Sequence, residues 1–334
     1  MKEKFNERVD YLTKKYFETL LNDFMNLEEE IKDEITIKPQ QIGFCRQFFL
    51  LLFRGYVNKF RNPFDIKMKI FTTININIML MILFGTFTFD FNEKYYVKFS
   101  EQETNFVDIQ NRNGALFVIA FLTVFTAFNN SLAIFLEEKP LFIRESLNNT
   151  YRSSAYFWAR SLNELAEYII MPAIIGLMCY APLGFQLEEE HFKKFMYVMV
   201  AAYFTGSGYG FILSTLVNSL ELAMAISPSV FVPLLIMGGL YVNQNSISVY
   251  FKVFEYISPF KYAFAATAIN EFEGLTFNCG RIKFDCDPLK QHEFEQTYWE
   301  CLYWLIGLSI VSRIISFKFL QKLSTPKTVR LSQH

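Results

Sequence analysis

Long apolar stretches recur along the 334-residue chain, and charged residues fall mainly between them. About 20 residues of α-helix cross a hydrocarbon core of about 30 Å. Five stretches without Asp, Glu, Lys or Arg reach that length, and a sixth is interrupted only by Arg313. Glu221 separates the fourth from the fifth, and polar residues follow Val242. The pattern predicts six transmembrane helices in an all-α membrane protein, over residues 70–89, 114–136, 164–187, 195–217, 222–242 and 299–318.

The segments that flank these helices have a different pattern. Residues 1–44 are rich in charge, and their apolar residues recur every three or four positions, which predicts a cytosolic amphipathic linker. A surface-lying membrane anchor is the alternative, and the acidic run Glu28–Glu30 disfavours it. Phe44–Phe60 mixes aromatic with basic residues, which is typical of an interfacial helix that enters the first span. Residues 321–334 are expected to form a cytosolic tail.

Composition supports membrane insertion and excludes other classes. Hydrophobic residues make up 52% of the chain and charged residues only 19%, whereas about 25% is usual for soluble domains. The net charge of −1 provides no basic field, so we expect no nucleic-acid partner. Lys and Arg are more frequent before the first span, after the second and after the sixth than in the other connections. This bias predicts that both termini lie in the cytosol. We expect a multi-pass protein of the plasma membrane or an organelle membrane.

The chain offers little chemistry of its own. Its three His residues are not spaced to share a metal, no phosphate-binding glycine loop is present, and no catalytic constellation can be assembled within a span. Arg313 is expected to extend from the end of the sixth span to the membrane surface. Cys279 and Cys286 lie in the predicted external segment Asn270–Tyr298 and could form a disulfide. Free thiols, or a pairing that involves Cys301, are the alternatives.

Several motifs, weak singly, occur together in order. The segment Phe48–Pro63 ends in R-N-P, N-R-x-G-x-L-F precedes the second span, and E-x-x-x-F-x-R-E and Y-R-x-x-x-Y-F follow it. The further matches are Gly238–Val242, Tyr256–Tyr262 and Asn270–Gly274. Over about residues 45–320, the chain resembles the ABC-2 type transmembrane domain of G-subfamily ABC half-transporters, the White and pleiotropic-drug-resistance type.

The resemblance implies roles for particular residues. Glu137, Glu138, Arg144 and Glu145 would belong to a cytosolic coupling segment that contacts the nucleotide-binding domain. The second and fifth helices would line a central cavity at a two-fold interface. The cavity residues implied are Phe125, Phe128, Val232 and Leu235, below an apolar plug of Leu240 and Tyr241. After the fifth helix, Tyr256–Tyr262 would begin an external re-entrant segment.

The resemblance also implies partners. The family's ATP-binding domain precedes the membrane domain, so we expect ATP and Mg to be bound by a nucleotide-binding domain that this chain lacks. That domain would be missing by truncation, carried on another chain, or lost. A second half-transporter, membrane lipid and a small amphipathic substrate would be the other partners. The predicted function is alternating-access export of lipid-like molecules. The alternatives are a non-transporting membrane scaffold and a separately encoded permease of the broader ABC-2 type.

Overall fold

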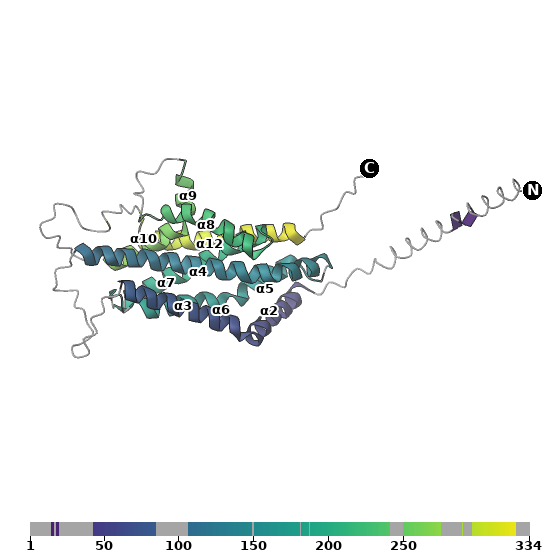
Figure 1. Cartoon of the computed structure of the whole chain (residues 1–334), viewed down its shortest axis with the longest axis horizontal. Coiled ribbons are helices and arrows are strands. Elements are labelled where there is room, and N and C mark those ends of the chain that lie inside the picture. The colour runs from purple at the N-terminus through teal and green to yellow at the C-terminus, as the bar shows by residue number, and fades with distance from the viewer. Residues whose placement is uncertain are drawn as a thin grey trace, which may run out of the picture. The chain divides into compact units, whose positions relative to one another are not determined.

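The computed structural model describes residues 15–16, 18–19, 43–84, 106–148, 150–180, 182–186, 188–240, 250–274, 289 and 296–324. The chain divides into a unit Met1–Gly43, of which only five residues fall within these ranges, and a unit Phe44–His334. All regular elements described are helices, which confirms the all-α class (Figure 1). The helices of the second unit are α2 (Phe44–Arg61), α3 (Pro63–Phe84), α4 (Phe106–Leu147), α5 (Ser153–Asn163), α6 (Leu165–Cys179), α7 (Glu189–Leu216), α8 (Leu220–Ile236), α9 (Lys252–Ile257), α10 (Pro259–Phe272) and α12 (Tyr298–Ser324).

Five segments within the described ranges are long and apolar enough to cross a membrane. They are Pro63–Phe84, Gln110–Leu147, Ser153–Cys179, Glu189–Leu216 and Tyr298–Ser324. These segments support an integral, multi-pass membrane protein. The predicted fifth span is represented by α8, which is apolar but has only 17 residues. The predicted count of six therefore stays a prediction.

Several helices of the structure have other bounds than the predicted spans. The candidate span over the predicted third helix runs from Ser153 to Cys179, because charged side chains in its first half are accommodated inside the protein. The helix predicted over 222–242 ends at Ile236, and Gly239, at φ +91°, adopts a conformation that favours glycine. Residues 137–145 are not a separate element after the second span. They continue α4 without a break, with Pro140 inside the helix.

Helix α7 lies at the centre of the bundle, between α4 and α12. Three glycines make this close packing possible, because a Cβ atom on any of them would overlap a neighbouring helix. On Gly206 it would lie 2.3 Å from the Val124 carbonyl oxygen in α4, and on Gly208 it would lie 2.0 Å from Ser312 Oγ in α12. Gly210 meets α4 again one turn later. The small-residue pattern of this helix thus serves packing within one chain.

The chain breaks between α9 and α10, as Ser258-Pro259 predicts. Ser258 accepts a hydrogen bond from the Lys261 amide as N-cap, and its hydroxyl donates to the Leu234 carbonyl at 2.7 Å. Almost all residues of α10 are buried in the protein. Lys261 forms a buried ion pair with Glu255 of α9. A re-entrant path of this segment into the membrane remains a prediction.

Candidate functional site

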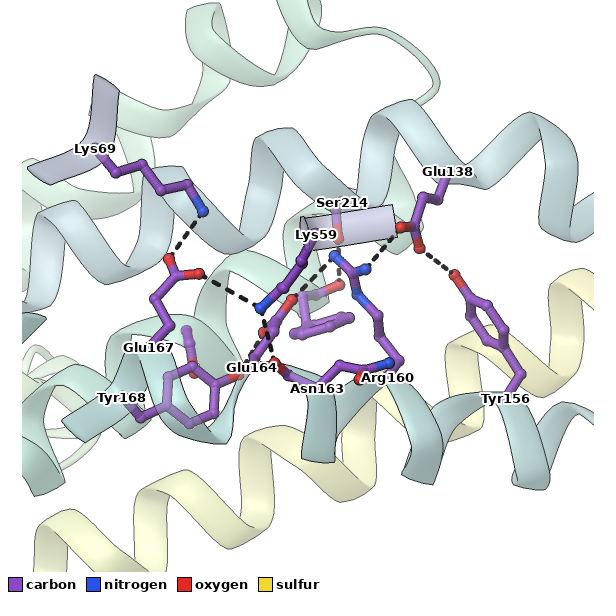
Figure 2. Close-up of polar contacts among 12 residues, drawn as sticks. Lys59, Lys69, Glu138, Tyr156, Arg160, Asn163, Glu164, Glu167, Tyr168 and Ser214 are labelled. Carbon is purple, nitrogen blue, oxygen red and sulfur yellow. Dashed lines mark hydrogen bonds and ion pairs between the residues drawn. The ribbon is translucent and has the colours of Figure 1, made fainter. Parts of the chain in front are cut away.

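The C-terminal part of α4 carries a carboxylate that faces the bundle. Glu138 accepts hydrogen bonds from Arg160 at 2.7 Å and from the Tyr156 hydroxyl at 3.0 Å (Figure 2). Both partners lie on α5, and the arginine side chain is buried. An ion pair at this depth is less screened by salt than a surface pair. The contact therefore links the end of α4 firmly to α5.

Arg160 begins a series of polar contacts that continues into the bundle. Its guanidinium lies 3.1 Å from the carboxylate of Glu164, which is buried and accepts a hydrogen bond from the Tyr168 hydroxyl. Tyr168 in turn accepts from Arg313 of α12 at 2.6 Å. We call Glu138, Arg160, Glu164, Tyr168 and Arg313 the polar chain. It connects four helices: α4, α5, α6 and α12.

The sequence analysis was wrong about Arg313. Its side chain points into the protein rather than to the membrane surface, with the residue only 8% exposed. The guanidinium donates to Ser207 Oγ at 2.5 Å and lies 4.9 Å from the ring centres of both Phe204 and Phe211. Aromatic faces and hydroxyl groups thus replace water around this cation.

Helix α2 joins the same region from outside. Arg54 donates two hydrogen bonds to Glu145 near the end of α4, at 3.0 and 3.1 Å, and its guanidinium lies over the Tyr151 ring. Lys59 donates to the Asn163 carbonyl at 2.7 Å. A Cβ on Gly55 would lie 1.9 Å from Asn163 Nδ2, so α2 and α5 approach each other closely at this glycine. The end of α4, α2 and α5 therefore form one connected unit.

Two lysines share one carboxylate beside this unit. Lys69 lies 2.8 Å from Glu167, and Lys59 lies 3.8 Å from the other oxygen of the same carboxylate (Figure 2). Burial lowers the pKa of the Lys59 ammonium group, against the opposing effect of the Glu167 and Glu164 carboxylates. The two ion pairs connect α2 and α3 to α6.

Lys139 makes a different connection, to the C-terminus of α7. Its side chain is buried, and its ammonium donates to the carbonyl oxygens of Ser214, Thr215 and Val217 at 3.2, 3.0 and 2.5 Å. The last carbonyls of a helix have no partner within the helix, and the negative end of its dipole favours a cation there. The end of α4 is thereby attached to the central helix as well as to α5.

The predicted coupling residues divide between two faces of α4. Glu138 and Glu145 point toward α5 and α2 and are paired, as described above. Glu137 and Arg144 are exposed, and within the described part of the chain neither has a hydrogen-bonding or ionic partner. The side chains of these two exposed residues are available to a binding partner.

The predicted cavity residues lie along the contact between α4 and α8. Phe128 is buried and packs against Phe231, with ring centres 4.2 Å apart. Phe125 is partly buried and contacts the same ring at 5.8 Å. Val232 is 49% exposed on α8, and Leu235 is partly buried.

The remaining predicted sites are only partly described. Leu240 is half-buried and packs against the main core. Tyr241, Cys279 and Cys286 lie outside the described residues. Cys301, the alternative disulfide partner, is buried at the start of α12, with a free thiol. The plug and the disulfide therefore stay predictions.

The comparisons with known proteins agree with the sequence motifs. The profile of the ABC-2 type transporter family matches residues 46–272. Protein white of Ceratitis capitata is 27% identical over 73% of this chain and 33% of its own length. ABC transporter G family member 7 of Arabidopsis thaliana is 26% identical over 81% of this chain and 36% of its own. The broad substrate specificity ATP-binding cassette transporter of Mus musculus is 28% identical over 70% and 34%. The chain thus spans about a third of the length of these relatives.

Proposed function

The chain belongs to the ABC-2 type transporter family, and we propose on this basis that it is the membrane-spanning part of an ATP-driven exporter of amphipathic small molecules. Its similarity to White and G-family transporters supports a membrane domain of a G-type half-transporter. The proposal adds a dimer with a second half-transporter and alternating access to a cavity between the two copies. ATP and Mg would be bound by nucleotide-binding domains outside the chain described above.

The observation that carries the proposal is the connected polar chain. A motor domain that pushes on the end of α4 can move distant helices only if that end is attached to them. Glu138 is bonded to Arg160, and the series of contacts continues through Glu164 and Tyr168 to Arg313. The Arg160–Glu164 pair is buried on both sides, and removing one partner of a buried ion pair costs about 3–5 kcal/mol, so this contact favours movement of α5 and α6 as a unit. Packed bundles respond to small shifts by moving between discrete arrangements.

The exposed face of α4 is the proposed docking surface. Arg144 is exposed, and Leu141 beside it is 38% exposed. A charged residue next to an apolar one can provide both orientation and buried area to a partner protein. We assign this surface to the nucleotide-binding domain.

The outward face of α8 is the proposed dimer interface. Its large apolar side chains Leu222, Met224, Val230, Val232 and Ile236 are all exposed. A second half-transporter facing this side would enclose an apolar cavity, which would suit a flat or amphipathic substrate.

The test uses the complete transporter, including its nucleotide-binding domains, reconstituted in liposomes. Glu138→Lys puts a cation against Arg160, and Arg144→Glu reverses the exposed charge. Arg46→Glu is the matched control, because Arg46 is exposed on α2 and belongs to neither the polar chain nor the two proposed surfaces.

We expect both coupling variants to insert into the membrane and to keep basal ATP hydrolysis. Substrate should no longer stimulate that hydrolysis, and transport should fall at least tenfold. The control should behave as the parent protein does. Unchanged transport in both coupling variants would show that this end of α4 has no coupling role.

A further inference from the structure

A cleft of about 690 Å³ lies beside the polar chain, between α2–α3 and α4. We call it the α3–α4 cleft. Its volume is within the range of about 300–1,000 Å³ that is usual for small-molecule sites. Asn58, Asn62 and Asn130 contribute amide groups to its wall. The exporter proposal places the substrate elsewhere, between two copies of α8, and so assigns nothing to this cleft.

The wall of the cleft holds equal numbers of basic and acidic side chains. The basic residues are Lys59, Arg61, Lys69 and Arg160. The acidic residues are Asp65, Glu137, Glu138 and Glu167. With a formal charge of zero, the cleft has no net attraction for a simple anion or cation. It instead offers both signs of charge to a ligand that carries both.

The charges are not all matched within the protein. Lys59 and Lys69 share the carboxylate of Glu167, and the Glu164 carboxylate also acts on Lys59. Arg61 and Glu137 are exposed, and within the described residues neither has a hydrogen-bonding or ionic partner. Arg61 comes from α2 and Glu137 from α4, so two different helices contribute these two charges to the cleft. Within the described residues, Arg61 is therefore an unpaired basic group of the lining and Glu137 an unpaired carboxylate, and Asp65 has only a hydrogen bond from Asn62.

The apolar surroundings favour a lipid over a soluble ligand. Ile66 and Met68 line the cleft from α3, and Ala133 and Ile134 line it from α4. Beyond the cleft, α3 continues with exposed apolar side chains, of which Phe71, Met79 and Ile82 are all more than 60% exposed. An acyl chain can lie along this surface while a polar headgroup occupies the cleft.

We propose that the α3–α4 cleft binds one zwitterionic phospholipid by its headgroup. The phosphate contacts Arg61 and the shared lysines Lys59 and Lys69, and the ammonium group contacts Glu137. Pockets with basic residues between transmembrane helices are known to bind lipid headgroups near the membrane surface. Here the Glu137 carboxylate adds a preference for a headgroup that also carries a positive charge.

The test is native mass spectrometry of the full chain in detergent, titrated with dioctanoyl phosphatidylethanolamine. Dioctanoyl glycerol lacks the headgroup, and phosphoethanolamine and inorganic phosphate lack the acyl chains. Arg61→Gln and Glu137→Gln each remove one unmatched charge. Arg46→Gln and Glu221→Gln are the matched controls, because both residues are exposed and lie outside the cleft.

We expect one phosphatidylethanolamine to bind, with about tenfold weaker binding in each cleft variant and unchanged binding in both controls. Binding by phosphoethanolamine or inorganic phosphate at the same concentrations would show a soluble-anion site and overturn the lipid assignment. Equal binding of dioctanoyl glycerol would show that only the apolar surface matters. Equal losses in cleft and control variants would show non-specific attraction and would also overturn the proposal. None of these results depends on transport, so they are independent of the exporter hypothesis.

Discussion

The close approach of α4 and α7 at Gly206 gives a sharp prediction. A Cβ there would lie 2.3 Å from the Val124 carbonyl oxygen and 3.0 Å from two further backbone atoms of that residue. No side-chain rotation can relieve an overlap with backbone, so Gly206→Ala must push the helices about 1 Å apart, to reach ordinary contact. Gly307, in α12, has nothing within 4 Å of its Cβ position. Gly307→Ala is therefore the matched control.

The magnitude follows from the difference between the two variants. Replacing Gly by Ala within a helix stabilises it by about 1 kcal/mol, and this gain is common to both sites. Overpacking costs about 1–3 kcal/mol and applies only at Gly206. Elsewhere along the interface, a gap of up to about 1 Å would also remove a quarter to a half of the attractive energy of each dispersion contact. We expect Gly206→Ala to be about 1–3 kcal/mol less stable than Gly307→Ala.

The assay is thermal unfolding of the purified chain in detergent, followed by the fraction that elutes as a single species in size-exclusion chromatography. Gly206→Ala should lose this species at a temperature several degrees below that of the parent, whereas Gly307→Ala should match or exceed the parent. Equal midpoints for the two variants would mean that α4 and α7 are not in backbone contact at this position, and the packing account of α7 would fail.

Further variants test other parts of the structure. Lys139→Met should lower stability by about 1–3 kcal/mol in the same assay, because the terminal carbonyls of α7 lose their donor; an unchanged midpoint would contradict this. Leu240→Ala should alter transport or basal ATP hydrolysis of the complete transporter, and Phe125→Ala should weaken substrate binding; normal values for both, at normal expression, would remove the cavity assignment. Gln291→Cys should react with a membrane-impermeant thiol reagent from the external side, and labelling only from the cytosol would reverse the topology.

Much of the fold could be predicted because membrane insertion restricts the sequence so strongly. The apolar stretches located the five long helices, and Ser258-Pro259 marked the break before α10. Locating the spans by stretches without charged residues failed where charged side chains form ion pairs inside the protein. Arg160 is buried against Glu164, and the predicted third span began only at residue 164, whereas the candidate span of the structure begins at Ser153 and includes Arg160.

The candidate site was harder to predict because its contacts join distant positions. The motif around α4 identified Glu138 and Glu145, but nothing in it indicated that their partners are Arg160 and Arg54. Arg313 was misassigned because a single arginine near a helix end does not reveal which face it occupies. A usable signal was present in Arg160, Glu164 and Tyr168, since a spacing of four places all three on one face of a helix.

The two proposals share two residues, and this has a thermodynamic consequence. Glu138 and Arg160 line the α3–α4 cleft, and they also begin the polar chain. A lipid that contacts this wall interacts with the same side chains that attach the end of α4 to the bundle. If alternating access moves α4 relative to α2 and α3, the width of the cleft changes, and the lipid binds one arrangement more tightly. If the lipid binds one arrangement of the helices more tightly than the other, bound lipid shifts the equilibrium toward that arrangement. By thermodynamic linkage, the equilibrium constant changes by the ratio of the two lipid affinities. Transport that responds to phosphatidylethanolamine in the parent protein, but not in Arg61→Gln, would be the expected sign of this coupling.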